Sequence, residues 1–238
     1  MADHIADGRA PGPGQPALGV VMLDTVFPRP PGDIGNPATF AFATRYQRVP
    51  AASPRRVVFG QAEGLGGAFV EAALALQAQG CQAIVTSCGF LALHHREMAA
   101  ALRVPFASSA LCWLPTLYQV CGGPEAVGVL TASAGALSDA HLEAVGGSAR
   151  SPRAGMDEAG EFARVILGNQ PEGDMARVGQ EVVETAVRFA AAHPRLRALV
   201  LECTNMPPYA AEIARRCRLP VFDLVSLARQ LMAGAAAR

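Results

Sequence analysis

The amino-acid sequence predicts an α/β fold with two pseudo-symmetric lobes, each a mainly parallel sheet flanked by helices. Short apolar segments alternate with helical stretches along the chain, which is typical of parallel sheets covered by helices. Two of these segments end in a matched cysteine, and a proline follows each cysteine at the same distance. We therefore expect two copies of one structural unit, with an active site in the cleft between them.

The first half of the chain begins the alternation. A stretch at 67–79, rich in Ala and Leu, is expected to form a helix that Gly80 ends. A long loop rich in Pro and Gly, at 24–37, follows the first apolar segment. Loops of this length often act as lids or binding elements. Strands are expected at 18–23, 56–59, 83–87 and 104–107, with a further helix at 91–102.

The second half repeats the pattern. Ser138 can cap a short helix through its side-chain oxygen. A longer amphipathic helix is expected at 174–192, between a Pro-Glu-Gly segment and Pro194. The remaining strands are expected at 127–130, 198–201 and 221–224, and the remaining helices at 209–217 and 226–233.

The internal repeat is the most informative feature of the sequence. Ala83-Ile-Val-Thr-Ser-Cys88 matches Ala198-Leu-Val-Leu-Glu-Cys203, an apolar strand with Cys five residues after the Ala in both cases. Pro105 follows the first Cys by 17 residues, and Pro220 follows the second by 17. Strand–helix–strand units share a general likeness, but equal spacing and matched cysteines favour a true repeat.

The repeat also predicts how the chain divides. Residues 1–17 are polar and rich in Gly and Pro, and we expect a flexible tail there. The first α/β lobe is expected at 18–115 and the second at 116–220. The C-terminal segment, 221–238, is expected to return to the first lobe.

Composition excludes several classes of function. Hydrophobic residues make up 51% of the chain and the formal net charge is zero, so no electrostatic attraction to nucleic acid or to an anionic membrane is expected. The 20 basic residues are all Arg. Without Lys, a Schiff base with substrate or pyridoxal phosphate cannot form, and a phosphate-binding P-loop is excluded.

The N-terminal segment and the cysteines predict a compartment. Residues 1–15 have no apolar core like that of a signal peptide, and no apolar run is long enough to span a membrane. We expect a cytoplasmic protein whose six cysteines are reduced. Four of them are expected to be structural, as small apolar side chains: Cys81, Cys112, Cys121 and Cys217.

Cys88 and Cys203 have a different setting, because each lies at the end of a strand, just before a helix. In parallel α/β sheets, ligands bind beyond the carboxyl ends of the strands. Racemisation beside a carboxylate needs a base on one face of the carbon and an acid on the other, which one thiolate and one thiol supply. A helix N-terminus is expected to lower the pKa of each thiol. Gly89 allows the backbone to approach a ligand closely.

At these motifs the sequence resembles the aspartate/glutamate racemase superfamily, which includes hydantoin racemases, maleate isomerases and arylmalonate decarboxylases. The resemblance covers nearly the whole chain beyond the tail. The two catalytic cysteines of the racemases match Cys88 in Thr-Ser-Cys-Gly-Phe and Cys203 in Glu-Cys-Thr-Asn-Met-Pro-Pro-Tyr. The decarboxylases have Gly in place of the first Cys, so Cys88 favours a racemase or isomerase.

The resemblance also implies substrate-binding residues. Leu23-Asp24-Thr25 looks like the end of the family's first strand, and Phe59-Gly60 is similar to an aromatic–Gly pair at the glutamate racemase pocket. Asn205 is a departure, because glutamate racemases have His and aspartate racemases Glu there, which weakens the case for Glu or Asp as substrate. The expected substrate-binding residues are Asp24, Thr25, Phe59, Gly60, Gly89, Phe90, Thr131, Ser133, Thr204 and Asn205.

The sequence therefore predicts a cofactor-independent, metal-free racemase or epimerase acting on an amino acid or related small carboxylate. Alternatives within the superfamily are a cis–trans isomerase and a decarboxylase. An alternative of another class is a non-catalytic protein that binds a small ligand. Arg29, in the first loop, can bind a carboxylate or lie solvated at the surface. The apolar helices are compatible with a homodimer.

Overall fold

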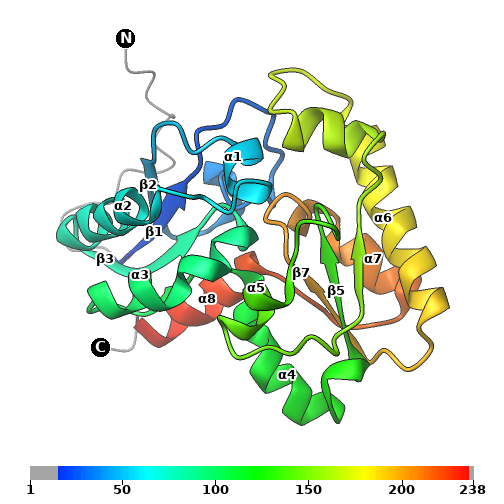
Figure 1. Ribbon diagram of the computed structural model, residues 1–238. Coiled ribbons are helices and arrows are strands. Elements are labelled where there is room, and N and C mark those ends of the chain that lie inside the picture. The colour runs from blue at the N-terminus through cyan, green and yellow to red at the C-terminus, as the bar shows by residue number, and fades with distance from the viewer. Residues whose placement is uncertain (1–15, 236–238) are drawn as a thin grey trace.

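The computed structural model describes residues 16–235, which form two four-stranded sheets lying side by side (Figure 1). Residues 1–15 of the predicted tail lie outside the described residues, and the first strand begins at the last residue of that tail, Ala17. Every strand pair in both sheets is parallel. Across the described residues, none of the helices has both the length and the apolar character that a membrane crossing needs.

The first sheet has the strand order β2-β1-β3-β4. All six residues of its central strand β1 are buried, because the sheet is covered on both faces. Helix α2 (Gly66–Ala78) packs against β1 and β3, and so does the C-terminal helix α8 (Leu224–Ala235). The strands are β1 (Ala17–Met22), β2 (Ala43–Arg48), β3 (Cys81–Thr86) and β4 (Phe106–Ala107).

The second sheet has the order β6-β5-β7-β8, which repeats the first sheet strand for strand. Helix α4 (Leu114–Cys121) packs against β5 and β7, and α6 (Met175–Ala192) packs against β6. The predicted two-lobe α/β fold is confirmed, with each matched cysteine following the equivalent strand. The strands are β5 (Val127–Thr131), β6 (Arg153–Gly155), β7 (Ala198–Leu201) and β8 (Val221–Phe222).

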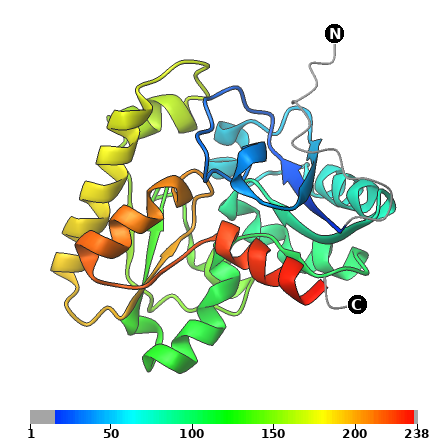
Figure 2. The ribbon, with the colours of Figure 1, turned by 180° about the vertical axis from the view of Figure 1, so that it is seen from behind.

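The C-terminal segment divides between the lobes. Strand β8 pairs with β7 and so belongs to the second sheet. Helix α8 then crosses to the first lobe, as the view from behind shows (Figure 2). Trp113, at the junction of the lobes, donates its indole N–H to the carbonyl of Asp223 at 3.1 Å. The chain therefore passes between the lobes twice, once before α4 and once after β8.

One expected strand is wrong, and one strand was missed. Residues 56–59 lie in and just after helix α1 (Pro54–Val58), not in a strand. Ser53 caps this helix by accepting a hydrogen bond from the Arg56 N–H at 3.3 Å, and Pro54 occupies its first turn, where its fixed φ favours the helix. The second strand of the first sheet is β2, an edge strand whose residues are mostly polar and only partly buried. Its composition therefore carries little strand signal.

The other helices follow the expected pattern with small changes. The helix expected at 91–102 is a 3₁₀ helix, η2 (Gly89–His94), followed by α3 (His95–Ala101). The predicted cap is confirmed, since Ser138 begins α5 (Asp139–Glu143) in a capping box with His141. The remaining elements are α7 (Ala210–Cys217), the 3₁₀ helices η1 (Pro37–Thr39), η3 (Ala110–Trp113), η4 (Pro124–Ala126) and η6 (Pro207–Tyr209), and a π-helical turn, η5 (Ala163–Leu167).

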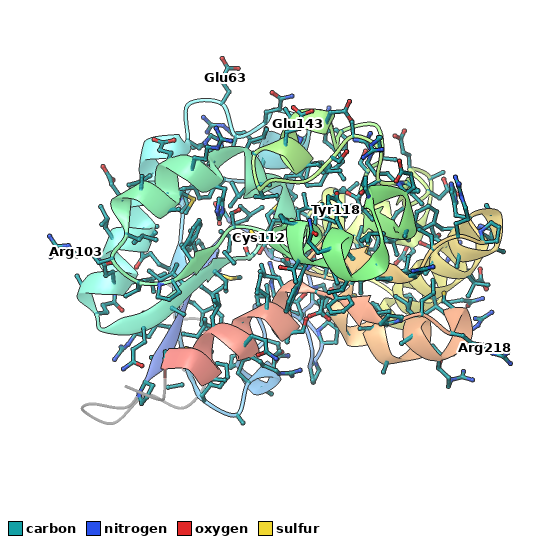
Figure 3. The ribbon with its side chains drawn as sticks, turned by 90° about the horizontal axis from the view of Figure 1, so that it is seen from below. Glu63, Arg103, Cys112, Tyr118, Glu143 and Arg218 are labelled. Carbon is teal, nitrogen blue, oxygen red and sulfur yellow. The ribbon has the colours of Figure 1, made fainter. Side chains whose placement is uncertain are left out.

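Many of the charged side chains lie at the surface of the molecule. Glu63, Arg103, Glu143 and Arg218 are exposed, and Figure 3 shows them around the rim, pointing away from the sheets. The interior is one connected cluster of apolar side chains that runs through both lobes and includes Cys88 and Cys203. The cysteine ends of β3 and β7 thus meet where the two lobes are packed together.

Candidate active site

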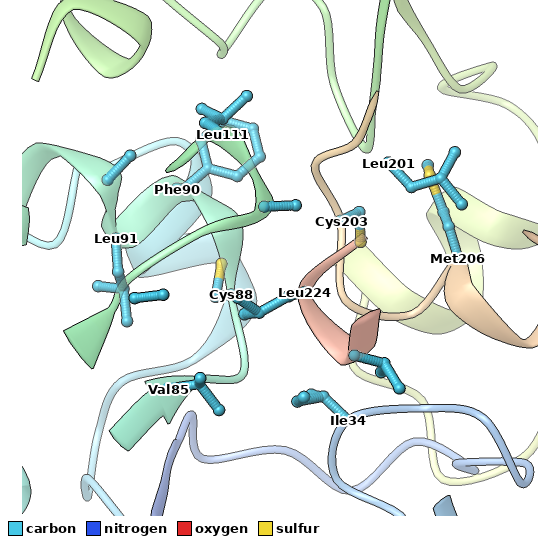
Figure 4. Packing of buried hydrophobic residues seen from close by; sticks show 14 of the residues in the cluster. Ile34, Val85, Cys88, Phe90, Leu91, Leu111, Leu201, Cys203, Met206 and Leu224 are labelled. Carbon is cyan, nitrogen blue, oxygen red and sulfur yellow. The ribbon is translucent and has the colours of Figure 1, made fainter. Parts of the chain in front are cut away.

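The two matched cysteines lie at equivalent positions of the two lobes and share one pocket. Cys88 comes two residues after β3 and begins η2, and Cys203 comes two residues after β7. Both side chains are almost buried, and Figure 4 shows them on segments from opposite lobes. Both line one pocket. The fold thus produces the juxtaposition that the repeat predicted.

The pocket is mostly apolar, with a few polar groups from each lobe. The first lobe contributes Leu23, Thr25, Phe27, Arg29, Pro54, Val58, Ser87, Cys88, Gly89 and Phe90. The second lobe contributes Ala132, Ile166, Leu167, Glu202, Cys203 and Asn205. A small, enclosed and largely apolar site with few polar groups is typical of a small-molecule ligand.

The residues beside the cysteines make reciprocal contacts across the lobe boundary. Thr204, after Cys203, donates its hydroxyl to the carbonyl of Ser87 at 2.6 Å. Gly89, after Cys88, lies against Glu202 in the equivalent way. A Cβ atom at position 89 would lie 2.3 Å from the Glu202 carbonyl and 2.2 Å from its Oε1. Only glycine fits at this position.

Ser87 and Glu202, which precede the cysteines, are also structural equivalents. Ser87 Oγ accepts a hydrogen bond from the Leu23 N–H, just after β1, at 2.9 Å. Glu202 accepts one from the Ala132 backbone, just after β5, and a second from the Thr131 hydroxyl to Oε2 at 2.6 Å. Each lobe therefore ties its cysteine segment to the neighbouring strand.

A chain of polar contacts links Cys203 to the long first loop. The Cys203 thiol donates to Asn205 Oδ1 at 3.5 Å, and Asn205 Nδ2 donates to Asp33 at 2.7 Å. Asp33 pairs with Arg29 at 2.7 Å, and Arg29 also donates to the Thr25 hydroxyl at 2.9 Å. Arg29 is thus a partly buried residue that lines the pocket, rather than a solvated one at the surface.

The expected lowering of the thiol pKa values is wrong for this pocket. Burial first, and the negative charge of Glu202 second, raise the pKa of Cys88 to about 12. Backbone groups of Phe90 and Leu91, at the start of η2, lower it, as does Arg29, but by less. The pKa of Cys203 is raised for the same two reasons, burial first and then Glu202. Removing a thiolate from water outweighs the help of the helix N-terminus.

Glu202 has an unusual pKa as well. Burial raises the pKa of its carboxyl group to about 7, although hydrogen bonds from Thr131 and Ala132 lower it. The carboxyl group therefore titrates near neutral pH. Perturbed groups of this kind gather at functional sites, although structural networks can also produce them.

The structure brings most, but not all, of the predicted site residues together. Six of them line the pocket: Thr25, Cys88, Gly89, Phe90, Cys203 and Asn205. Thr131 and Thr204 support it through their bonds to Glu202 and Ser87.

Besides Thr131 and Thr204, four predicted residues do not line the pocket. Ser133 is buried and accepts from the Ala136 N–H at 3.3 Å. Asp24 is 42% exposed and pairs with Arg48 at 3.3 Å. Phe59 and Gly60 are exposed, because the segment that was expected to be a strand is helix α1, and both residues follow that helix.

Two residues were missed as binding groups: Glu202, which lines the pocket, and Asp33, which contacts the pocket residues Arg29 and Asn205. Glu202 is a charged residue directly after a four-residue apolar strand, which is a readable signal of a functional position. Asp33 stands four residues after Arg29 in the long loop, a spacing that allows the ion pair. Within the described residues, no group of three or more His, Cys, Asp or Glu side chains is arranged to hold a metal ion.

The protein has two pseudo-symmetric α/β lobes, and each lobe places one cysteine in a shared pocket. It is therefore a two-lobed α/β protein with a paired-thiol site. The Asp/Glu/Hydantoin racemase family model matches residues 60–232, and the chain belongs to this family. Solved structures agree in fold. An allantoin racemase from Klebsiella pneumoniae has a TM-score of 0.63 at 17% identity, covering 93% of this chain and 88% of that one. A Gly-to-Cys mutant of arylmalonate decarboxylase has a TM-score of 0.60 at 19% identity, covering 92% and 94%.

Some curated relatives have a higher sequence identity than these solved structures and are named as dimethylsulfoniopropionate lyases. Dimethylsulfoniopropionate lyase 7 of Emiliania huxleyi (strain CCMP1516) is 28% identical over 92% of this chain and 67% of its own. Dimethylsulfoniopropionate lyase 5 of the same strain is 30% identical over 89% of this chain and 44% of its own. The lyase of Durusdinium sp. clade D is 28% identical over 92% of this chain and 74% of its own. The chain thus spans between about half and three quarters of the length of these relatives.

Proposed function

We propose that this protein transfers a proton at the carbon next to a carboxylate, with Cys88 and Cys203 as base and acid. The observation that carries the proposal is the pair of thiols at one small pocket, at equivalent positions of two pseudo-symmetric lobes. A thiolate on one side removes the α-proton, and its electron pair spreads onto the carboxylate. The thiol on the other side returns a proton to the opposite face, which inverts the carbon and exchanges the roles of the two cysteines.

Arg29 is the group best placed to hold the substrate carboxylate. Its guanidinium carries five N–H donors, and its contacts to Asp33 and Thr25 leave donors free. Asp33 and the Phe27 ring, 4.4 Å from the guanidinium carbon, fix its position. Its positive charge also lowers the pKa of Cys88. Arg29 therefore supports both the binding of the carboxylate and the thiolate that removes the proton from the neighbouring carbon.

A second outcome of the same first step is β-elimination. It is favoured by the 28–30% identity to proteins named dimethylsulfoniopropionate lyases over most of this chain. After one thiolate removes the α-proton, the electron pair can form a carbon–carbon double bond and expel a group from the β-carbon. This reaction needs one base, whereas racemisation needs a base and an acid on opposite faces.

Incubation in D₂O with proton NMR distinguishes these outcomes. The panel contains amino acids, hydantoins, substituted malonates and dimethylsulfoniopropionate. Loss of the α-hydrogen signal from both enantiomers of one compound supports racemisation. Formation of acrylate and dimethyl sulfide supports elimination, and release of carbon dioxide supports decarboxylation without a prior α-proton transfer. The absence of any reaction with every compound of the panel would overturn the proposal in favour of a ligand-binding protein.

A further inference from the structure

The pocket at the two thiols is closed in this structure. Cys88 and Cys203 are each 8% exposed, and the cavity that they line has a volume of about 20 Å³. A cavity of this size holds about one or two water molecules. A carboxylic acid with a substituted α-carbon needs more space than this. Part of the wall must therefore move before such a compound reaches the thiols.

Much of the wall is fixed to the two sheets. The segments that carry Cys88 and Cys203 directly follow β3 and β7, which are interior strands of their sheets. The first loop is anchored through Asp33, which pairs with Arg29 and accepts a hydrogen bond from Asn205 of the second lobe. Moving either part would break contacts that hold the lobes together.

The π-helical turn η5 is held more loosely. Its residues Ile166 and Leu167 line the pocket, and the turn packs against α1. In both ribbon views this yellow-green turn lies beside the dark blue first loop (Figures 1 and 2). Within residues 16–235, the segment 163–170 is hydrogen-bonded to the first lobe through Asn169 alone. The turn is therefore the part of the wall that can move with the fewest bonds broken.

Asn169 holds this turn to the first loop with both ends of its side-chain amide. Its Oδ1 accepts a hydrogen bond from the Val26 N–H at 2.9 Å, and its Nδ2 donates to the Asp24 carbonyl at 3.4 Å. Asp24 and Val26 flank Thr25, which lines the pocket and accepts a hydrogen bond from Arg29. The two bonds of Asn169 thus join the lobes directly beside the pocket.

The backbone at Asn169 shows that its side chain is not needed for the turn. The residue has a φ of 51°, in the left-handed region, and it follows Gly168 at the end of η5. Glycine adopts this conformation at no steric cost and is the usual residue after a helix end, with Asn the next most common. The turn could therefore end as well on glycine. The amide of Asn169 instead serves the contact between the lobes.

We propose that Asn169 is a clasp that keeps η5 closed over the pocket, and that compounds reach Cys88 and Cys203 when this clasp opens. Opening exchanges two hydrogen bonds between the lobes for bonds to water and leaves both sheets intact, as a local opening does. Asn169 is a gating residue, which sets how often the pocket admits a reactant. The inference goes beyond the proposed proton transfer, because access matters to any reaction of these thiols.

Alkylation by iodoacetamide measures access to the thiols, because the full chain carries its own reporters. The rate at each cysteine is followed by peptide mass spectrometry at one mildly alkaline pH. Cys88 and Cys203 report opening of the pocket. Cys81, which is buried in the first sheet and outside the pocket, reports unfolding of the whole chain. Cys217 is partly exposed outside the pocket and reports the activity of the reagent.

Asn169→Gly keeps the left-handed backbone and removes the clasp. We expect Cys88 and Cys203 to be alkylated roughly tenfold faster, because two ordinary hydrogen bonds bias an opening by about that factor. The rates at the two reporters outside the pocket should not change. Arg218→Gly is the matched control, since Arg218 also has a positive φ, of 53°, and is exposed at the rim of the molecule, outside the pocket (Figure 3). It should change none of these rates.

Asn169→Asp is a second variant, which also serves if Asn169→Gly does not fold. It keeps the acceptor for the Val26 N–H but loses the donor to the Asp24 carbonyl, so a smaller rise at the two pocket thiols is expected.

The inference is overturned if the pocket thiols react at the same rate with and without the clasp. It is also overturned if the rate at Cys81 rises equally, or if Arg218→Gly gives the same rise. The test of proton transfer is separate, because alkylation is measured without substrate. Gated thiols without α-proton exchange would refute only the proposed function, and exchange with unchanged alkylation would refute only the inference.

Discussion

The two lobes share a strand order and a cysteine position but differ in the residues beside the cysteine. The first lobe reads Ser87-Cys88-Gly89, and the second reads Glu202-Cys203-Thr204. The thiols are therefore arranged symmetrically, whereas the charges around them are not. Under the proposed function, the symmetric pair of thiols supplies the two proton-transfer groups, and the residues in which the lobes differ orient the substrate.

The loops beyond the strands add to the same asymmetry. The long first loop places Phe27, Arg29 and Asp33 at or beside the pocket. In the second lobe, the π-helical turn contributes only the apolar side chains of Ile166 and Leu167. The first lobe thus provides an ion pair, Arg29 with Asp33, whereas the second lobe provides an acid, Glu202, that forms no ion pair among the described residues. Two identical copies of one unit would place the same charges at the pocket, so the difference comes from the residues in which the two lobes differ.

The largest expected effect comes from removing either thiol. Cys88→Ser and Cys203→Ser should each reduce racemisation by roughly a thousandfold, because a serine hydroxyl is a far weaker acid than a thiol and each face needs its own proton-transfer group. The rate of α-proton exchange in D₂O measures this. Cys217→Ser, which changes a partly exposed thiol outside the pocket, should keep full activity. If one pocket variant keeps most of its activity, a single base suffices and elimination is favoured.

The second effect is a dependence of stability on pH that the buried carboxyl group of Glu202 should produce. The pKa of Glu202 is about 7 in the folded protein and near its ordinary value of 4.5 when unfolded. Between these values the folded state binds a proton that the unfolded state has released, so stability falls as pH rises through this window. The contribution amounts to roughly 3 kcal/mol.

Glu202→Gln removes that contribution. Denaturant unfolding of both proteins at several pH values between about 4.5 and 7 should show the unsubstituted chain losing stability relative to the variant as pH increases. Parallel curves for the two proteins would show that Glu202 does not titrate in this range.

A smaller effect is expected where the lobes meet at Gly89. Gly89→Ala places a Cβ within 2.3 Å of the Glu202 carbonyl and should reduce the free energy of unfolding by about 1–3 kcal/mol. Gly67→Ala is the control, since a Cβ there meets nothing within 4 Å, and within helix α2 it should leave stability unchanged or raise it slightly. Equal free energies of unfolding for the two variants would contradict the expectation that the contact with Glu202 excludes a side chain at position 89.

The smallest effect is expected at the reciprocal contact. Thr204→Val keeps the shape of the side chain but removes the hydroxyl that bonds the Ser87 carbonyl, and should reduce the free energy of unfolding by about 1 kcal/mol. Thr204→Ser keeps the hydroxyl and should retain most of that stability. Denaturant unfolding compares the three proteins. A loss of the same size in both variants would assign the effect to packing rather than to the hydrogen bond.

Much of the fold could be predicted because its signals are local. The buried strands β1, β3, β5 and β7 are continuous apolar runs, and Gly80 and Ser138 mark helix ends by their backbone preferences. The edge strand β2 could not be predicted in this way. Its residues are partly exposed, and it forms only because β1 offers it an unpaired edge.

The sequence by itself determined that this chain has two equivalent lobes and that Cys88 and Cys203 lie at equivalent strand ends. Both follow from the spacing of the matched residues along the chain, which does not depend on how the side chains pack. Only the tertiary structure decided between neighbours such as Asp24, which faces Arg48 at the surface, and Thr25, which faces the pocket. It also decided that Glu202 lies buried against Gly89 from the other lobe. Which way a side chain points, and how little water reaches it, depend on contacts between residues more than a hundred positions apart, and those contacts set the charge of the site.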